Sequence, residues 1–160
     1  MSTTSDRSDP RLTHGTDAGP VPQAEVYLVL SEAERARGFT RPLRRSYRHV
    51  GPPGPEHELR DLTDEERERY ADAGYVKFEE YWSGEAHGGM FWTQERLDGI
   101  GKGCGAVTTM APDIAESYAR QPGMYGSTYC CTCMRHLFVG ERGEFTWIEQ
   151  DGSDGPRVGT

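Results

Sequence analysis

Hydrophobic residues in this chain come in short runs, separated by polar, glycine-rich or proline-rich stretches. The first run lies at residues 25–30 and is typical of a short buried strand. Ser31 and Glu34 follow it with the spacing of a capping box, so we expect a short helix that ends near Arg37. Residues 45–50 predict a second strand.

The same kinds of signal continue along the rest of the chain. Further helices are predicted where a capping residue, or a proline suited to the first helical turn, precedes polar residues. They lie at 63–73, 93–97 and 112–120. Further strands are predicted from short apolar or aromatic runs at 75–81, 126–130 and 144–148. The last two of these strands could pair with each other.

Short strands and short helices that are interspersed, without an internal repeat, predict an α+β fold. We expect residues 25–150 to form a single small mixed domain. Residues 1–24 are mostly small and polar, which predicts a disordered tail. Residues 151–160 predict a turn followed by a C-terminal tail.

The composition indicates a thin hydrophobic core. The 160 residues include 20 glycines and 10 prolines. Apolar residues, counted with glycine and without tyrosine, are roughly 41% of the chain, below the ~45–50% of ordinary globular proteins. A chain with a thin core and many loops gains most from a cross-link or a bound metal.

The net charge of −8 argues against wholesale coating of nucleic acid, but the charge is unevenly distributed. Residues 35–48 contain six arginines and no acidic residue. These arginines are either solvated or paired with acids of the helix that follows, or they form a patch for an anionic partner. The candidate binding patch comprises Arg41, Arg44, Arg45 and Arg48.

The chain shows no signal for a membrane or for secretion. No stretch approaches the ~18 apolar residues of a membrane span, and the N-terminus lacks the apolar segment of a secretory signal. We therefore expect a cytoplasmic protein with no membrane partner, in a reducing compartment where disulfides are rare. Clustered cysteines then favour a metal or redox role.

The clearest chemical signal is a group of cysteines in the C-terminal third. Cys130, Cys133 and His136 follow one another at intervals of three residues, and Cys104 can approach them from an earlier loop. Thiolate and imidazole are the ligands that Zn²⁺ prefers, and structural zinc sites hold four of them in a tetrahedron. The sequence therefore predicts a Zn²⁺ site of Cys104, Cys130, Cys133 and His136, within a zinc-binding part at about 100–148.

Several alternatives to this ligand set stay open. Cys131 could replace either of its neighbours, and His87 is a rival for the fourth position. The cysteines could also be free thiols, a redox dithiol of Cys130 and Cys133, or a disulfide.

Catalytic signatures are weak in this sequence. It has neither the H-x-E with P-C-x-x-C of zinc deaminases nor H-E-x-x-H, and it has no G-x-S-x-G. Four candidate protein ligands without a signature acid favour a closed, structural ion over a catalytic one. A metal-dependent hydrolase remains an alternative, with Glu79, Glu80 or Glu116 as the general base.

Several C-terminal segments carry a resemblance to known proteins. They are Gly103-Cys104-Gly105-x-Val107-Thr108-Thr109-Met110, Glu116-x-Tyr118-Ala119-Arg120, Tyr125-Gly126-x-Thr128-Tyr129-Cys130 and Glu144-Phe145-x-Trp147. They resemble a family of small uncharacterised proteins common in bacteriophages of actinobacteria, over roughly residues 25–160. The resemblance implies a phage-encoded protein made in the host cytoplasm, with a zinc-ribbon-like C-terminal subdomain around Cys-x-x-Cys. It brings no activity with it.

These observations together predict a non-enzymatic, zinc-stabilised protein that binds a host or phage macromolecule, most simply another protein. The first alternative is a nucleic-acid-binding protein that uses the basic segment from Arg35 to Arg48. The second alternative is the metal-dependent hydrolase. The sequence does not indicate an oligomeric state.

Overall fold

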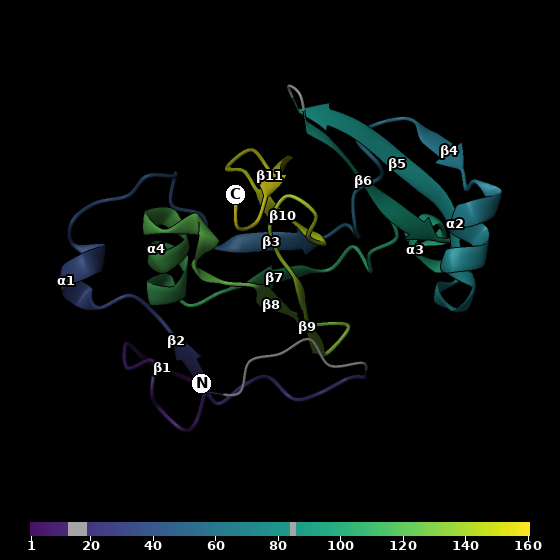
Figure 1. The fold of residues 1–160 in the computed structure, drawn as a ribbon. Coiled ribbons are helices and arrows are strands. Elements are labelled where there is room, and N and C mark those ends of the chain that lie inside the picture. The colour runs from purple at the N-terminus through teal and green to yellow at the C-terminus, as the bar shows by residue number, and fades with distance from the viewer. Residues whose placement is uncertain (13–18, 84–85) are drawn as a thin grey trace. The chain divides into compact units, whose positions relative to one another are not determined.

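The protein was analysed as a computed structural model that describes residues 1–12, 19–83 and 86–160, with the side chains of 82–87 left out of the description. The fold is a mixed α+β arrangement of short helices and small sheets, as predicted (Figure 1). None of the helices among the described residues is both long and apolar enough to cross a bilayer.

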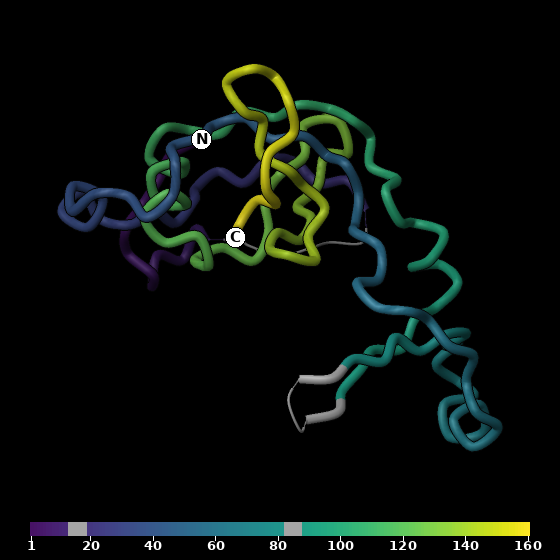
Figure 2. Tube along the Cα trace, turned by 90° about the horizontal axis from the view of Figure 1, so that it is seen from above, coloured from purple at the N-terminus to yellow at the C-terminus, as the bar shows by residue number. Residues whose placement is uncertain are grey.

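The contacts within the chain divide it into two compact units. Unit 1 consists of residues 1–52 and 103–160, and unit 2 consists of residues 53–102. The chain leaves unit 1 after residue 52 and returns to it at residue 103, and this path can be followed by colour in Figure 2. Unit 2 begins within the proline-rich stretch 51–55, where proline removes backbone donors and restricts the preceding residue.

A four-stranded antiparallel sheet forms the centre of unit 1. In spatial order its strands are β11 (Asp154–Arg157), β10 (Phe145–Ile148), β3 (Ser46–His49) and β7 (Val107–Thr109). Alternate residues of β3 and β10 are buried, so that Tyr47 and Trp147 lie opposite each other on the core face. The predicted strands at 45–50 and 144–148 are therefore present.

Helix α4 (Pro112–Arg120) supplies the other side of this core. Its residues Ile114, Ala115 and Tyr118 are buried, and the Tyr118 ring meets the Trp147 ring edge-on at 5.5 Å. Proline occupies the first turn of the helix, as predicted, because that position has no helical hydrogen bond to lose. The short 3-10 helix η2 (Pro122–Met124) follows it.

The segment after η2 forms a hairpin of β8 (Ser127–Cys130) and β9 (Arg135–Phe138). The predicted pairing of the strands at 126–130 and 144–148 is wrong, because β10 pairs with β3 and β11. A return of the chain directly after Cys130 gives β8 a nearer partner, and a tight turn closes it at a low cost in entropy.

Both ends of the chain contain structure where tails were predicted. Strand β1 (Ser2–Thr4) pairs in parallel with β2 (Val26–Leu28), and β11 adds to the central sheet. Val158, beyond β11, is fully buried. The backbone pairing of β1 and β11 and the burial of Val158 place parts of both ends in the fold, although their composition alone predicts tails. Residues 13–18 of the predicted N-terminal tail lie outside the described residues.

Ser31 caps α1 (Glu32–Arg35) through the backbone N–H of Glu34, in agreement with the predicted helix start.

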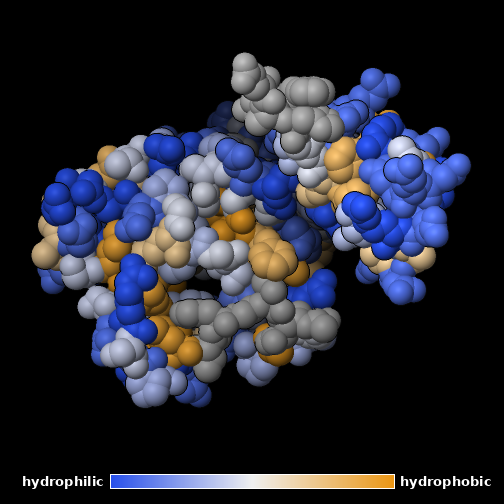
Figure 3. All heavy atoms as spheres, viewed as in Figure 1, coloured by the Kyte–Doolittle hydropathy of each residue, from blue (hydrophilic) through white to orange (hydrophobic). Residues whose placement is uncertain are grey.

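Hydrophobic residues appear only as small groups among hydrophilic ones on the face shown in Figure 3.

Unit 2 is a three-stranded antiparallel sheet with short helices. The strands are β4 (Leu59–Asp61), β5 (Tyr75–Ser83) and β6 (Ala86–Thr93), and the helices are α2 (Asp64–Arg69), η1 (Ala71–Ala73) and α3 (Gln94–Asp98). The Thr63–Glu66 capping box at α2 is present in full. Glu79 is buried, where it accepts hydrogen bonds from the Trp92 indole and the backbone N–H of Glu56 and His57.

Candidate metal centre

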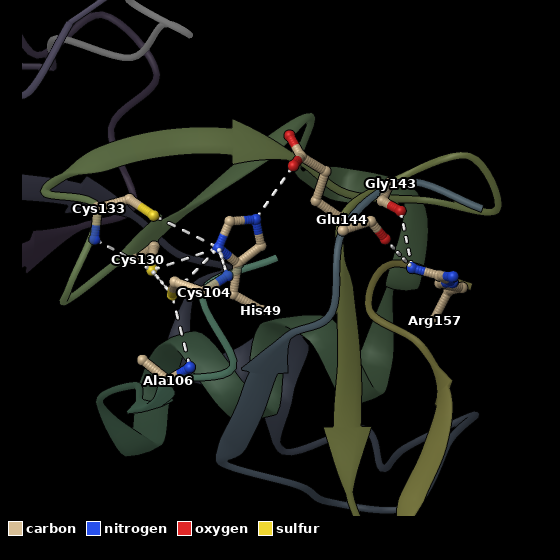
Figure 4. Close-up of polar contacts among 9 residues, drawn as sticks. His49, Cys104, Ala106, Cys130, Cys133, Gly143, Glu144 and Arg157 are labelled. Atoms are coloured by element: carbon tan, nitrogen blue, oxygen red, sulfur yellow. Dashed lines mark hydrogen bonds and ion pairs between the residues drawn. The ribbon is translucent and has the colours of Figure 1, made fainter. Parts of the chain in front are cut away.

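Four side chains of unit 1 converge on one point: His49, Cys104, Cys130 and Cys133 (Figure 4). Their ligand atoms all lie within 4.8 Å of one another. His49 ends β3, Cys104 lies in the loop before β7, and Cys130 ends β8 with Cys133 in the turn that follows. Three segments that are distant in sequence therefore meet here.

The spacing of these atoms matches a tetrahedral ion. With Zn–S and Zn–N distances of about 2.3 and 2.0 Å, ligand atoms in a tetrahedron lie about 3.5–3.8 Å apart. Nδ1 of His49 lies 3.2 Å from Sγ of Cys104, 3.4 Å from that of Cys133 and 3.8 Å from that of Cys130. The sulfurs of Cys104 and Cys130 are 3.5 Å apart, and all the cysteines are free thiols.

The structure brings three of the four predicted ligands together and replaces the fourth. The histidine in the cluster is His49, not His136. His136 lies opposite Tyr129 in the β8–β9 hairpin, while Cys130 lies opposite Arg135. Because neighbours on a strand point to opposite faces, His136 and Cys130 are on different faces of the hairpin. His136 contacts the hydroxyl of Tyr27 at 3.2 Å instead.

His49 was missed because sequence spacing gives no signal for it. It lies 55 residues before Cys104 and only enters the site through the pairing of β3 with β7. One clue was present, since a strand over 45–50 with Tyr47 inside also places His49 inside. His49 is indeed 4% exposed, which is low for a histidine without a partner.

Glycines on both sides of Cys104 allow its loop to reach the site. A Cβ at Gly103 would lie 2.2 Å from the carbonyl oxygen of His49, so the two backbones approach too closely for any side chain. Gly105 has φ of +75°, a conformation that costs other residues energy. The backbone N–H of Ala106 then donates to Sγ of Cys104.

The Cys130–Cys133 turn brings two sulfurs to the same side of the chain, toward the other members of the cluster. The backbone N–H of Cys133 donates to Sγ of Cys130 at 3.5 Å, and that of Met134 donates to the carbonyl of Cys130 at 2.9 Å. Met134 has φ of +53°, the left-handed conformation that reverses the chain into β9. Hydrogen bonds to a sulfur favour its thiolate form.

Glu144 fixes the orientation of the imidazole. Its carboxylate lies 3.0 Å from Nε2 of His49, on the opposite side of the ring from the sulfurs (Figure 4). Burial alone lowers the pKa of His49, but the hydrogen bonds to Glu144 and Cys104 outweigh it and the pKa is raised. A carboxylate that accepts from the distal nitrogen leaves the lone pair of Nδ1 directed toward the sulfurs, where it also accepts from the backbone N–H of Cys104 at 3.2 Å.

The three thiols have different pKa values. Burial raises the pKa of Cys130, and burial together with the two other sulfurs raises that of Cys133 to about 12. Burial also opposes ionisation of Cys104, but the N–H of Ala106 and the contact with His49 bring its pKa down to about 7. A cation that binds here must displace the protons of Cys130 and Cys133.

The alternative ligands lie elsewhere or are not described. Cys131 is exposed, and its thiol contacts the carbonyl oxygen of Val107 at 3.4 Å. Its backbone N–H donates to the hydroxyl of Thr108. The side chain of His87 lies outside the described part of the chain.

The four predicted patch arginines all contact other groups of unit 1. Arg44 forms a two-pronged pair with Glu149, at 3.1 and 2.8 Å, and Arg48 pairs with Asp154 at 3.1 Å. Arg45 donates to the carbonyl of Met110, and Arg41 donates to that of Thr160. The acids that pair with these arginines belong to the β10–β11 region and not to the helix that follows them.

Comparison of the chain with protein-family models, with curated proteins and with solved structures gives no match. The geometry of the cluster therefore carries the functional argument.

Proposed function

We propose that this protein binds one Zn²⁺ ion through His49, Cys104, Cys130 and Cys133, and that the ion has a structural role. The tetrahedral spacing of one imidazole nitrogen and three sulfurs carries the proposal. Sulfur-rich tetrahedral sets select zinc among the common metals.

Closure of the site supports a structural role. A catalytic zinc keeps a position for water or substrate, whereas four protein ligands fill the tetrahedron. Of the three acids named for a hydrolase, Glu116 pairs with Arg35 and Glu79 accepts from Trp92. The third, Glu80, lies 3.8 Å from Arg60. All three carboxylates have partners of their own, which favours the non-enzymatic interpretation.

The ion would stabilise the fold because it joins segments that are distant in the sequence. It would join the end of β3, the loop before β7 and the β8–β9 turn in a unit whose core is thin. Structural zinc in small peptides contributes roughly 10–16 kcal/mol, comparable to the whole stability of a domain. The zinc-ribbon-like character predicted for the C-terminal part rests on this ion and the hairpin turn together.

The test is metal analysis of protein purified without added metal, together with His49→Ala and His136→Ala. We expect about one zinc per wild-type chain, a loss of zinc in the His49 variant, and retention of zinc in the His136 variant. Cobalt substitution gives a second readout, because tetrahedral thiolate coordination produces visible absorption bands.

Two cysteines that lie close together in the sequence provide a second comparison, of a proposed ligand with a neighbour that is not one. Cys133→Ser should abolish tight binding, while Cys131→Ser, two residues away, should leave it intact. Wild-type protein that is well folded and holds no zinc when zinc is supplied would contradict the proposal. A zinc that survives His49→Ala but not His136→Ala would show that the ligand set is wrong.

A macromolecular partner and a phage origin stay predictions of the sequence. The pairs of Arg44 with Glu149 and of Arg48 with Asp154 lower the positive potential that the patch could offer an acidic partner. Arg44 and Arg45 line an open groove of about 660 Å³ together with Leu43 and Ile148. Glu149 and Asp151 line the same groove, so its charge is mixed.

A further inference from the structure

The N-terminal segment is fastened to the metal-binding turn. We use the name N-terminal strap for residues 2–4 and 19–28, which are brought together by the parallel pairing of β1 with β2. The backbone N–H of Val21 donates to the carbonyl of Met134 at 2.5 Å. Met134 is the residue directly after Cys133, so this bond depends on the same turn that presents two of the proposed ligands.

The sequence around Val21 makes this contact unusually specific. Pro20 and Pro22 have no backbone N–H, so Val21 carries the only backbone donor of the three residues. The N–H of Val21 donates to the carbonyl of Met134. Met134 has the left-handed backbone conformation, which sets the direction of this carbonyl. A proline-flanked residue in a stiff, extended segment loses little entropy when it makes such a bond.

A second contact joins the strap to the same hairpin. The hydroxyl of Tyr27 lies 3.2 Å from Nε2 of His136 and also accepts from the backbone N–H of Ala24. The rings of Tyr27 and Tyr129 lie 5.9 and 5.4 Å from that of His136. The histidine that does not enter the metal cluster therefore anchors the strap to β9.

The strap covers part of the core. Gln23 of the strap and Met1, which directly precedes it, line a cavity of about 40 Å³ together with Tyr27, Tyr47 and Tyr118. A cavity of this size holds roughly two or three water molecules. The hydroxyl of Tyr118 is buried and makes no hydrogen bond among the described residues, which leaves a polar group in need of a partner there. Release of the strap would open this cavity.

We propose that zinc occupancy controls the docking of the N-terminal strap. This inference rests on the proposed zinc site. Zinc fixes Cys130 and Cys133, the fixed turn holds the carbonyl of Met134 toward Val21, and the strap closes over the tyrosine-lined cavity. Loss of zinc frees the turn, and the strap detaches. Because coupling between two binding events is reciprocal, loosening the strap must also weaken zinc binding by the same factor.

Because zinc binding and strap docking affect each other equally, the coupling can be tested by measuring zinc binding to variants of the full chain. Val21→Pro removes the single donor from a segment that is already proline-rich, and Val21→Ala keeps that donor as the matched control. We expect Val21→Pro to weaken zinc binding roughly 2- to 10-fold in competition with a chelator, the range expected for one net hydrogen bond. Val21→Ala should bind zinc as the wild type does.

Trypsin cleavage gives the direct readout of the strap. Arg7 and Arg11 lie between β1 and the rest of the strap, so we expect cleavage at both to accelerate in zinc-loaded Val21→Pro and in wild-type protein as zinc is withdrawn. Tyr27→Phe, which removes the contact with His136 without altering the backbone, is the second variant and should act in the same direction.

The outcomes separate the two proposals. If zinc binds the wild type tightly but Val21→Pro and Val21→Ala bind it equally, the coupling is wrong and the metal site stands. Unchanged cleavage at Arg7 and Arg11 across a zinc titration likewise overturns the coupling. If the wild type binds no zinc, the site and the coupling both fail.

Discussion

At the scale of single residues, the candidate centre depends on groups that are not themselves among the four proposed ligands. Glu144 holds the distal nitrogen of His49 at 3.0 Å, and Gly103 leaves the gap through which the loop of Cys104 approaches the backbone of His49. Outer groups of this kind set the tautomer of a histidine ligand and its direction, and their loss weakens metal binding about 10- to 100-fold.

Glu144→Gln is therefore expected to weaken zinc binding within that 10- to 100-fold range. The amide retains the size of the carboxylate but not its charge, so the imidazole loses its preferred orientation and part of its basicity. Competition with a chelator of known affinity measures the change. Glu149→Gln is the control, since Glu149 belongs to the same unit and pairs with Arg44 instead. Equal losses in both variants would show a general charge effect and refute the positioning role.

At the scale of elements, capping residues decide where the short helices begin. Ser31, Thr63 and Thr93 each accept a hydrogen bond from a backbone N–H in the first turn of α1, α2 and α3. At α2 the box is complete, because Glu66 also accepts from the N–H of Thr63. Arg60 on β4 pairs with the same carboxylate at 2.7 Å and thereby ties the helix to the sheet of unit 2.

This arrangement gives α2 a pH dependence of known sign. The hydrogen bonds from Arg60 and Thr63 lower the pKa of Glu66 to about 2, below the ~4.3 of an unfolded chain. The carboxylate therefore stabilises the fold above the unfolded pKa, and that contribution is lost as the pH falls from about 5 to about 2.

We expect Glu66→Gln to destabilise α2 at pH 7 and the difference from the wild type to vanish toward pH 2. Amide hydrogen exchange of α2 across this pH range measures it. Glu65→Gln, one residue earlier in the first turn, is the control. A difference that persists undiminished at pH 2 would show that the charge of Glu66 is not the cause.

At the scale of the whole molecule, the proposed ligands all belong to unit 1. Unit 2, residues 53–102, contains none of the four and has its own buried residues, among them Leu62, Trp92 and Glu79. If zinc binds as proposed, we therefore expect the stability that it supplies to be confined to unit 1.

We expect chelation of zinc to abolish amide protection in β3 and β8 while β5 and β6 retain theirs. The reason is that the four proposed ligands lie in unit 1 only, and the hydrogen bonds of the β5–β6 hairpin are internal to unit 2. Residue-resolved hydrogen exchange with and without chelator checks it. Restoring zinc provides the reversibility control. Simultaneous loss of protection in both units would mean that the two are one cooperative system.

The sequence by itself determined the local elements of this protein. Capping boxes, the proline at position 112 and the alternation over 45–50 act between residues a few positions apart, so they can be recognised without tertiary contacts. The predicted helix at 112–120 matches α4 at both ends. The short Cys130–Cys133 spacing is local too, and it indicated two members of the cluster that the structure shows, with Cys104 as a third.

Only the tertiary structure decided which histidine completes the cluster, which strands pair, and that residues near both chain ends form strands. His136 is three residues from Cys133, yet the pleat of the β8–β9 hairpin places it on the other face from Cys130. His49 is far away in sequence, yet the pairing of β3 with β7 brings it to 3.2 Å from Cys104. Strand register and sheet order depend on contacts across the whole chain, and no local pattern contains them.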